Sequence, residues 1–411
     1  MLRRLLKGGL PAVLSSGVVA IVPLSGVIFL PGEEYAIWAL ASTLSTVFVV
    51  FDFGTSALAT KLAGSNSLST KTILNLLWIS ALPPAILGVA SMAVWPFYAK
   101  AAGLTYFPVQ DAVLLLGLVA IGTLLRSAGV LFAAVALGRR HFVRRSAVLL
   151  SGAIIQLAVT LLSLASGVGI MSLGFGIVAG GLTQAIVAIV LEASSPRTSF
   201  ASIDTRAIIW RFVKSKGAIT ALGLCVTQFD RWAVGLVGDP ALLATYDVAT
   251  RLATMPKIAL IAIAAGLVAE SARESSLESL TKLLARSQRW NVAAVIVAGV
   301  IAGLVTFYFI DFGYDPVLTA AVIVLTGMAH IANGATIAPS MILTGRGRPD
   351  LELRYIVPLA ITCIAAYVLG IGFQSWPVLL GLWSVSMVGW SIWFVHKSPA
   401  YVRKAWDVRE V

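Results

Sequence analysis

The stretch FDRWAVGLVGDPALLATYDVATRLATMPK, residues 229–257, places charged side chains inside two long apolar segments. The two segments meet at the turn Gly238-Asp239-Pro240. Across the whole chain, 59% of the residues are hydrophobic and 12% are charged, whereas soluble domains have roughly 45–50% and 25%. This composition indicates an integral membrane protein. Charges are costly inside a bilayer and are retained where they pair or line a polar path, so those within 229–257 point to transport.

Apolar stretches close to the length of about 20 residues that crosses a bilayer recur about twelve times along the chain. We place them at 9–30, 35–60, 72–97, 109–137, 146–167, 169–191, 208–237, 241–269, 290–310, 315–343, 354–374 and 376–395. A chain crossing lipid this often must satisfy its backbone within each segment, which favours helices. We therefore expect an all-α, polytopic membrane protein with about twelve transmembrane helices.

The 30 Lys and Arg residues are distributed unevenly around these spans. With the N-terminus in the cytoplasm, all but five lie in cytoplasmic segments. The exceptions are Lys100, in an outside loop, and Arg126, Arg231, Arg251 and Lys257, within spans. This asymmetry predicts a cytoplasmic-membrane protein with both termini inside the cell. The net charge of +12 then reflects basic loops that face anionic lipids, rather than a nucleic-acid-binding surface.

The second half of the chain repeats features of the first half. Residues 38–46, WALASTLST, align with 246–254, YDVATRLAT, and Gly138-Arg139 aligns with Gly345-Arg346. Both matches have an offset of about 208 residues, which indicates an internal duplication. An even number of spans in each half makes the repeats parallel. We therefore expect an N-terminal six-helix lobe (1–195), a cytoplasmic linker (196–206), a C-terminal six-helix lobe (207–396) and a cytoplasmic tail (397–411).

The hairpin at 229–257 brings four charges to a similar depth. Asp230 and Arg231 precede the turn by nearly the same number of residues as Asp247 follows it, and Arg251 lies one helical turn beyond Asp247. At 1.5 Å per residue, all four lie about 12–18 Å from the turn. Two interpretations stay open: a structural clamp that pins the hairpin, and a rearrangeable network at the outer part of a translocation cavity.

Other polar residues also lie within the predicted spans. Arg126 is midway along 109–137 and needs a partner or water, while Lys257 follows Pro256, where a helix can bend during gating. Asp52 fits a structural role and a functional role equally well. We expect His330 and Asn333 to be buried and hydrogen-bonded between helices.

The cytoplasmic segment 273–290 has a pattern of its own. Ser275 and Glu278 form a capping box, and Leu277, Leu280 and Leu284 share one helical face. This pattern predicts an amphipathic helix that lies on the inner membrane surface or under the bundle.

Three motifs resemble one transporter family. They are YAIWAL (35–40), DFGTSALATKLA (52–63) at the end of the second span, and FDRWAVGLVGDPALLATYDVATRL (229–252). They are similar to motifs of the oligosaccharide flippases for O-antigen and related polysaccharides, in the multidrug/oligosaccharidyl-lipid/polysaccharide exporter superfamily. The resemblance extends over both halves. It implies two six-helix lobes around a central cavity that opens alternately to each side of the membrane.

The resemblance also implies a substrate, a polyprenyl-diphosphate-linked oligosaccharide moved to the outer leaflet for surface polysaccharide assembly. Such a charged head cannot cross hydrocarbon unaided, and arginine's planar fork suits diphosphate. We therefore expect the substrate to be bound by Arg126, Arg231, Arg251 and Lys257. An ion-coupling or cavity network would comprise Asp52, Asp230 and Asp247. Other expected partners are anionic lipids at the cytoplasmic face and a polysaccharide polymerase or glycosyltransferases, with no cofactor, metal or nucleic acid.

Two other classes of protein stay open. A cation-coupled multidrug exporter of the same superfamily would bind its coupling ion at Asp52, Asp230 or Asp247. An integral-membrane glycosyltransferase or polysaccharide polymerase would need catalytic groups, commonly on a sizeable outer loop. The longest outside connection is only about residues 98–107, so we rank the enzyme last and expect no catalytic residues.

The topology can be tested with reporter fusions. A reporter fused after Gly238 should give the signal of an outside location, and one fused after Arg289 should give that of an inside location, because the basic loops remain in the cytoplasm. The opposite pattern of signals would contradict the predicted orientation.

Overall fold

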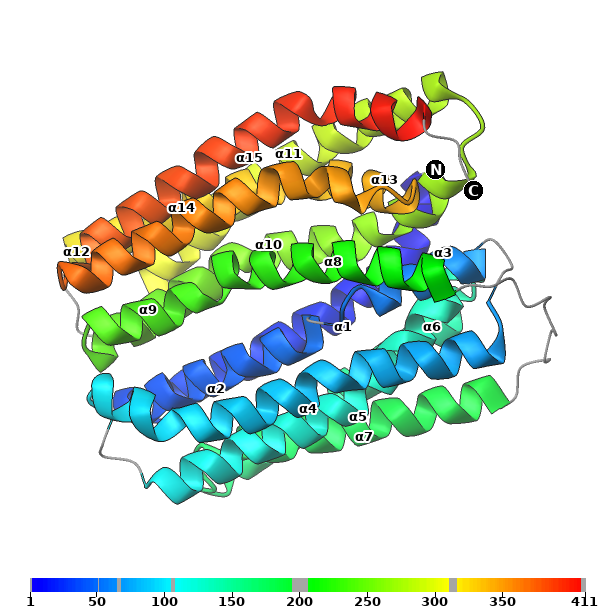
Figure 1. Ribbon diagram of the computed structural model, residues 1–411. Helices are drawn as coiled ribbons and strands as arrows, with labels where there is room; N and C mark the ends of the chain where they lie inside the picture. Colours follow the sequence, from blue (N-terminus) through cyan, green and yellow to red (C-terminus); the bar gives the residue numbers. More distant parts are fainter. Residues whose placement is uncertain are drawn as a thin grey trace. The chain divides into compact units, whose positions relative to one another are not determined.

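A computed structural model gives the fold of the 411-residue chain. It describes all residues except 1, 51, 65–67, 105–107, 194–205, 310–315 and 408–411. Every regular element in the described part is helical (Figure 1). The elements are α1 (Leu2–Phe29), α2 (Gly32–Val50), α3 (Thr55–Gly64), α4 (Thr70–Ala101), α5 (Val109–Gly138), α6 (Phe142–Ala165), α7 (Met171–Ala193), α8 (Arg206–Thr227), α9 (Phe229–Val237), α10 (Pro240–Arg273), α11 (Leu277–Phe309), α12 (Pro316–Gly334), α13 (Ile337–Gly345), the 3-10 helix η1 (Pro349–Glu352), α14 (Leu353–Gly372) and α15 (Trp376–Asp407).

Each predicted span falls on one helix or on two consecutive helices. Within the described ranges, 9 helical segments are long and apolar enough to cross a membrane. They correspond to α4, α5, α6, α7, α10, α11, α12 with α13, η1 with α14, and α15. The predicted all-α, polytopic fold class is therefore confirmed.

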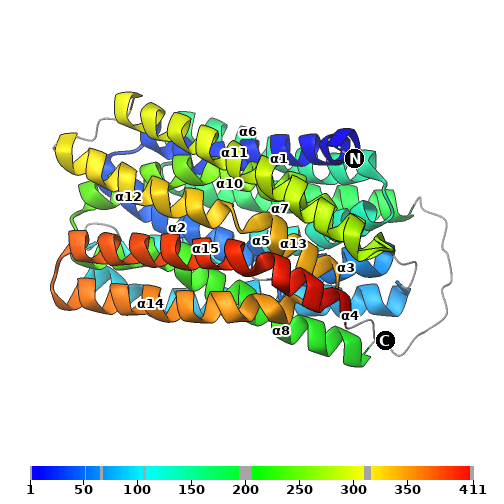
Figure 2. The same ribbon diagram turned by 90° about the horizontal axis from the view of Figure 1, so that it is seen from above.

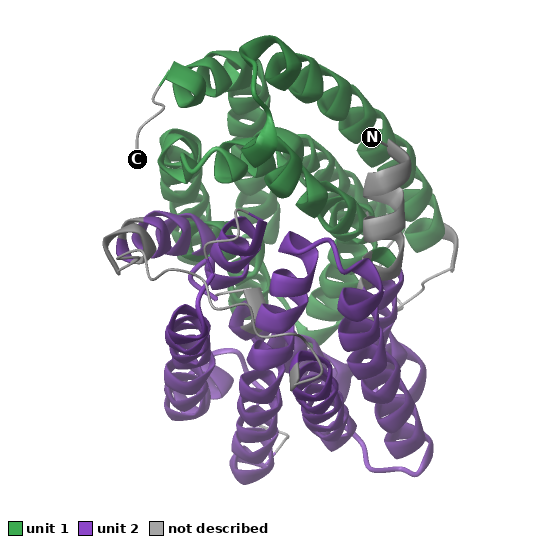
Figure 3. Cartoon of the chain, turned by 90° about the vertical axis from the view of Figure 1, so that its right-hand side faces the viewer, with its two compact units in different colours: residues 1–13, 221–411 green, residues 14–220 purple. Residues whose placement is uncertain are grey.

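The chain forms two compact units (Figure 3). Unit 1 comprises Met1–Val13 and Ala221–Val411, and unit 2 comprises Leu14–Thr220. The division passes within α1 and within α8. The lobes expected at 1–195 and 207–396 stay a prediction, and most of the expected linker lies outside the described residues. Helix α15 continues to Asp407, through most of the expected tail.

Unit 1 is organised around α10 and α15. Helix α10 packs against α11, α12 and α13, while α15 packs against α12 and α14. Helices α14 and α15 lie side by side in both views (Figures 1 and 2). This packing places polar side chains of α10, α12, α14 and α15 within reach of one another.

Unit 2 is held together by close packing of α5, α6 and α7. A Cβ atom at Gly181 on α7 would overlap the carbonyl oxygen of Gly122 on α5. Between α6 and α7, a Cβ atom at Gly152 would lie 2.9 Å from the Gly180 carbonyl oxygen. Small residues allow such close approach between membrane helices, where van der Waals packing drives association.

The duplicated Gly-Arg pair has the same packing role in each unit. A Cβ atom at Gly138, the last residue of α5, would overlap the Thr60 carbonyl oxygen on α3. A Cβ atom at Gly345, the last residue of α13, would overlap the Val268 carbonyl oxygen on α10. Thr60 and Val268 are related by the offset of about 208 residues that relates the halves of the sequence. The duplication is therefore visible in the packing as well as in the sequence.

The arginines that follow these glycines bind neighbouring helices. Arg139 pairs with Glu192 of α7 at 3.4 Å. Arg346 donates to the carbonyl oxygens of Ser271 and Glu274, each at 3.4 Å, and its guanidinium lies 4.7 Å from the ring centre of Trp406. In the same loop, the two hydrogen bonds from Arg348 to Asp350, both 2.9 Å, raise the pKa of Arg348 above its ordinary value.

Three spans that hydropathy predicts as continuous are broken. Span 35–60 divides into α2 and α3, span 208–237 into α8 and α9, and span 315–343 into α12 and α13. At the first break, Phe53 and Gly54 have positive φ angles of 53° and 74°, which a helix cannot accommodate. Hydropathy reports apolar length rather than backbone angles, so it could not locate these breaks.

The segment 273–290 also differs from the prediction of a separate amphipathic helix. Leu277 begins α11, which continues without a break to Phe309. No Pro or Gly interrupts the sequence between the amphipathic part and the ninth span, so one helix includes both. The side chain of Ser276 accepts the hydrogen bond from the Ser279 N–H at 3.2 Å, so the cap is one residue later than expected.

Substituting the duplicated glycines tests this packing. Gly138→Ala and Gly345→Ala should each destabilise the protein by about 1–3 kcal/mol, because the added methyl group meets backbone atoms of another helix. The measurement is thermal unfolding of the purified protein in detergent. Gly389→Ala in α15 is the matched control, since no atom lies within 4 Å of a Cβ atom there. Equal stability of all three variants would show that the contacts are loose.

Candidate functional site

The α9–α10 hairpin positions the largest group of buried charges in the described part of unit 1. Pro240 begins α10, and the Asp239 carboxylate caps the helix by accepting a hydrogen bond from the Leu242 N–H at 2.7 Å. This cap fixes the turn, so that the charged residues of both arms face one another. The structure brings together Asp230, Arg231, Asp247 and Arg251.

Asp247 is the centre of this hairpin network. Its Oδ1 accepts a hydrogen bond from Nε of Arg231 at 2.7 Å, and its Oδ2 accepts one from Nε of Arg251 at 2.6 Å. The Asp247 side chain is fully buried, and the Arg231 and Arg251 side chains are 4% and 11% exposed. Because two guanidiniums share one carboxylate, removing Asp247 would leave two buried cations without their central partner.

Asp230 extends the network towards the start of α9. Its Oδ2 accepts a hydrogen bond from the Tyr246 hydroxyl at 2.6 Å, and its Oδ1 lies 3.8 Å from Nη1 of Arg231. Oδ1 accepts no hydrogen bond from any described residue. Two carboxylates therefore balance two guanidiniums within the hairpin.

The break between α8 and α9 leaves backbone carbonyl groups without a helical partner, and side chains donate hydrogen bonds to them. Trp383 Nε1 and the Tyr367 hydroxyl both donate to the Val226 carbonyl oxygen, at 2.9 and 3.0 Å. The Tyr367 hydroxyl also lies 3.1 Å from the Cys225 carbonyl oxygen, and Arg231 Nη1 donates to that of Thr227 at 3.5 Å. The last carbonyls of a helix need such partners, especially where no water is available. Arg231 thus supports the broken helix as well as the charge network.

Lys257 belongs to a second polar chain in unit 1. Its ammonium group donates to Oδ1 of Asn333, and Nδ2 of Asn333 donates to the Tyr355 hydroxyl at 2.8 Å. The Tyr355 oxygen lies 3.3 Å from that of Ser391. The chain therefore connects α10, α12, α14 and α15. The prediction that Asn333 hydrogen-bonds between helices is confirmed.

His330 does not follow the prediction made for it. It is fully buried, and neither ring nitrogen has a hydrogen-bond partner among the described residues. Its ring instead meets that of Trp383 edge to face, with centroids 5.6 Å apart. An aromatic contact therefore takes the place of the expected hydrogen bond.

Arg126 is held within unit 2 by two neutral amides. Its Nε donates to Oε1 of Gln184 at 3.2 Å, and its Nη1 donates to Oε1 of Gln156 at 3.1 Å. The three residues lie on α5, α7 and α6, which are the helices joined by the glycine contacts. No carboxylate of a described residue forms an ion pair with Arg126. Among the described residues, the Arg126 guanidinium therefore has two amide hydrogen-bond partners and no directly paired carboxylate.

Asp52 caps α3. Its carboxylate accepts hydrogen bonds from the N–H groups of Gly54 and Ser56 at 2.8 and 2.9 Å, and from the Thr55 hydroxyl at 3.3 Å. It also lines, with Arg126, a cavity of about 10 Å³, which is about the space that one water needs. The geometry supports the structural interpretation of Asp52.

The structure therefore divides the seven predicted site residues between the two units. Four form the hairpin network, Lys257 lies in a separate chain of the same unit, and Asp52 and Arg126 lie in unit 2. Four hydrogen-bonding partners in these groups were not predicted from the sequence: Tyr246, Gln156, Gln184 and Tyr355. Gln156 and Gln184 were detectable, because an amide inside an apolar span needs a hydrogen-bond partner. Among the described residues, no three His, Cys, Asp or Glu side chains gather as a metal site.

The comparisons with known proteins show the fold. No protein-family model and no curated protein matches the chain. An outward-facing multidrug resistance MATE family transporter of the MOP superfamily matches with a TM-score of 0.78 and 12% identity, over 100% of this chain and 97% of that chain. A MOP superfamily transporter from Pyrococcus furiosus Vc1 (DSM3638) matches with a TM-score of 0.73 and 12% identity, over 98% and 96% of the chains. MATE in the straight conformation matches with a TM-score of 0.73 and 12% identity, over 99% and 97%. The chain therefore has the fold of MATE transporters of the MOP superfamily.

Proposed function

We propose that the protein is a membrane transporter that moves a polyprenyl-diphosphate-linked oligosaccharide from the inner to the outer leaflet of the cytoplasmic membrane. The mechanism would be alternating access, as expected for a fold shared with an outward-facing MOP superfamily transporter. The translocated oligosaccharide would be used in the assembly of cell-surface polysaccharide. The partners would be the lipid-linked glycan and the polymerase or glycosyltransferases that act before and after it.

The hairpin network is the observation that carries this proposal. A diphosphate offers the kind of charged oxygen that Arg231 and Arg251 now bind on Asp247. The guanidiniums could therefore exchange the carboxylate for the phosphate without losing an acceptor, and their planar forks would hold it through paired hydrogen bonds. Such an exchange makes the network a reversible binding site rather than a fixed clamp.

Two further cations fit an anionic substrate. Lys257 is bound by the amide of Asn333 and Arg126 by the amides of Gln156 and Gln184. A neutral amide satisfies hydrogen bonds but leaves the positive charge in place. In a low-dielectric surrounding such charges attract a diphosphate strongly.

A cation-coupled multidrug exporter is the second candidate. It is supported by the description of one structural neighbour as a multidrug resistance transporter and by the buried Asp230, whose Oδ1 accepts no hydrogen bond from any described residue. A carboxylate oxygen of this kind suits a coupling proton or metal cation. In this alternative, Asp52 or Asp247 would be the other candidate ligands of the coupling ion.

Two variants of the hairpin test the role of Arg251. Arg251→Lys keeps the positive charge but removes the planar fork, so it should lower polysaccharide export on the order of tenfold with little change in protein abundance. Asp247→Asn should lower abundance, since losing one partner of a buried ion pair costs about 3–5 kcal/mol. Surface polysaccharide and membrane protein level are measured in a strain lacking the native gene.

Arg403→Lys, at an exposed position of α15, is the matched control for the loss of a fork. Normal export by Arg251→Lys, combined with reduced abundance of Asp247→Asn, would assign the network a purely structural role. Arg251 would then not be the diphosphate ligand.

Deleting the gene distinguishes the two candidate functions. The flippase proposal predicts loss of surface polysaccharide and unchanged susceptibility to a cationic dye such as ethidium, because the buried cations disfavour a positively charged substrate. Polysaccharide staining and dye accumulation are measured in the same strain. Increased dye accumulation with normal polysaccharide would favour the exporter.

A further inference from the structure

Helix α11 is longer than is needed to cross the bilayer, and the additional length lies at its N-terminal end. Helix α11 has 33 residues, or about 50 Å at 1.5 Å per residue. From Asn291 to Phe309 it carries no Asp, Glu, Lys or Arg, and this part is about 28 Å long, close to the ~30 Å hydrocarbon core. All its charged residues precede Trp290. Trp290 therefore marks the level at which the helix leaves the hydrocarbon.

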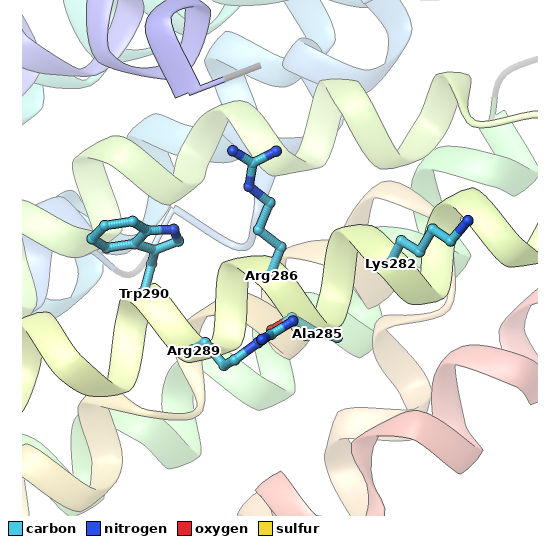
Figure 4. Close-up of a pocket in the computed structure, with 5 residues that line it drawn as sticks. All are labelled: Lys282, Ala285, Arg286, Arg289 and Trp290. Atoms are coloured by element: carbon cyan, nitrogen blue, oxygen red, sulfur yellow. The ribbon is translucent and has the colours of Figure 1, made fainter.

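The two faces of this first part have different environments. Leu280, Leu283 and Leu284 are buried against the rest of unit 1, with exposures of 0%, 4% and 3%. The opposite face contributes Lys282, Ala285, Arg286, Arg289 and Trp290 to a hollow of about 670 Å³ (Figure 4). In Figure 4, Lys282, Arg286 and Trp290 rise from the same side of the helix, as their spacing of four residues requires. We call Lys282, Arg286 and Arg289 the basic stripe.

The basic stripe has a net positive charge. Lys282 forms an ion pair of 2.5 Å with Glu278, and both side chains are largely exposed. Arg286 and Arg289 form no ion pair with any described residue, and the bond from Arg289 Nε goes to the neutral carbonyl of Ala285 at 3.3 Å. Two guanidinium groups beside an indole ring thus face the hollow without a counter-charge from the described residues.

Beyond Trp290, towards the C-terminal end of α11, the exposed surface of the helix is apolar. Ile296, Val297, Val300, Ile301 and Leu304 are between 47% and 61% exposed. Val297 and Ile301 continue the line of Trp290 at helical spacing. A molecule with a negative head and a hydrocarbon tail would cover both parts, whereas a free anion or an acidic soluble protein would leave the apolar part exposed.

We propose that the basic stripe and Trp290 bind the phosphate headgroup of an anionic phospholipid whose acyl chain lies along α11. The guanidinium forks bind the phosphate oxygens, and the indole lies at the level of the headgroup, where tryptophan is enriched. This lipid is distinct from the transported substrate. The inference does not depend on the proposed function.

Native mass spectrometry of the full-length protein in detergent tests the proposal. With equal concentrations of phosphatidylglycerol and phosphatidylcholine, the wild type should bind phosphatidylglycerol preferentially. Arg286→Gln with Arg289→Gln should reduce phosphatidylglycerol binding on the order of tenfold, because each basic residue near an anionic lipid surface contributes severalfold to affinity. Phosphatidylcholine binding and thermal unfolding should not change.

The matched control is Arg403→Gln with Lys404→Gln, which removes two exposed positive charges from α15. This control should bind phosphatidylglycerol as the wild type does. Equal losses in both double variants would assign the effect to net charge and overturn the proposal. Wild-type binding by the Arg286 and Arg289 variant, or equal binding of both lipids by the wild type, would overturn it too. Should the double variant unfold, the single variants Arg286→Gln and Arg289→Gln replace it. A reduced preference for phosphatidylglycerol in either single variant supports the site, and wild-type preference in both overturns the proposal.

Discussion

The bonds from Asp247 to two guanidiniums are the interaction on which the α9–α10 hairpin of unit 1 depends. Arg231 comes from α9, a helix of only 9 residues, and Arg251 from α10, so one carboxylate ties both arms of the hairpin. Taking ions out of water is costly unless their partners are in place. Each buried charge of the hairpin therefore needs its partner, and the Asp239 cap holds the turn that brings the two arms together.

A related constraint acts on the backbone where a membrane span is broken. The end of α8 leaves carbonyl groups that no further turn of helix can satisfy. Tyr367, Trp383 and Arg231 donate hydrogen bonds to them. At the break before α3, the Asp52 carboxylate satisfies N–H groups in the same way. Polar residues inside this protein therefore support helix ends as well as the proposed transport path, and the two roles meet in Arg231.

Patterns among residues close in sequence predicted the helices and the depth of the hairpin charges. They did not predict the helix breaks or the surroundings of His330. The length of each apolar stretch located the helices, and residue spacing around Gly238-Asp239-Pro240 placed Arg231 and Asp247 at one depth. These two features could be predicted because each is determined by residues that are close together in the sequence. The break between α8 and α9 escaped prediction because its stabilising partners are distant in the sequence: Trp383 is 157 residues from Val226, and Tyr367 is 141. The same reason applies to His330, whose environment is set by Trp383 from another helix. The proposed roles of the cations depend on a ligand, and neither sequence nor fold contains one.

The duplicated halves share their packing, and the buried cations of the chain are held in two ways. In both halves, a glycine lets one helix meet another backbone at positions related by the same offset, as Gly138 and Gly345 show. In the hairpin network, two carboxylates match two guanidiniums, whereas the hydrogen-bond partners of Arg126 in unit 2 and Lys257 in unit 1 among the described residues are side-chain amides. In a neutral network, a guanidinium can exchange its carboxylate partner for another anion and later bind the carboxylate again. A cation that is hydrogen-bonded to an amide keeps its charge and attracts anions at all times. The proposed diphosphate-linked substrate would require both properties, since constant attraction alone would retain the substrate and exchange alone would not draw it into a low-dielectric region.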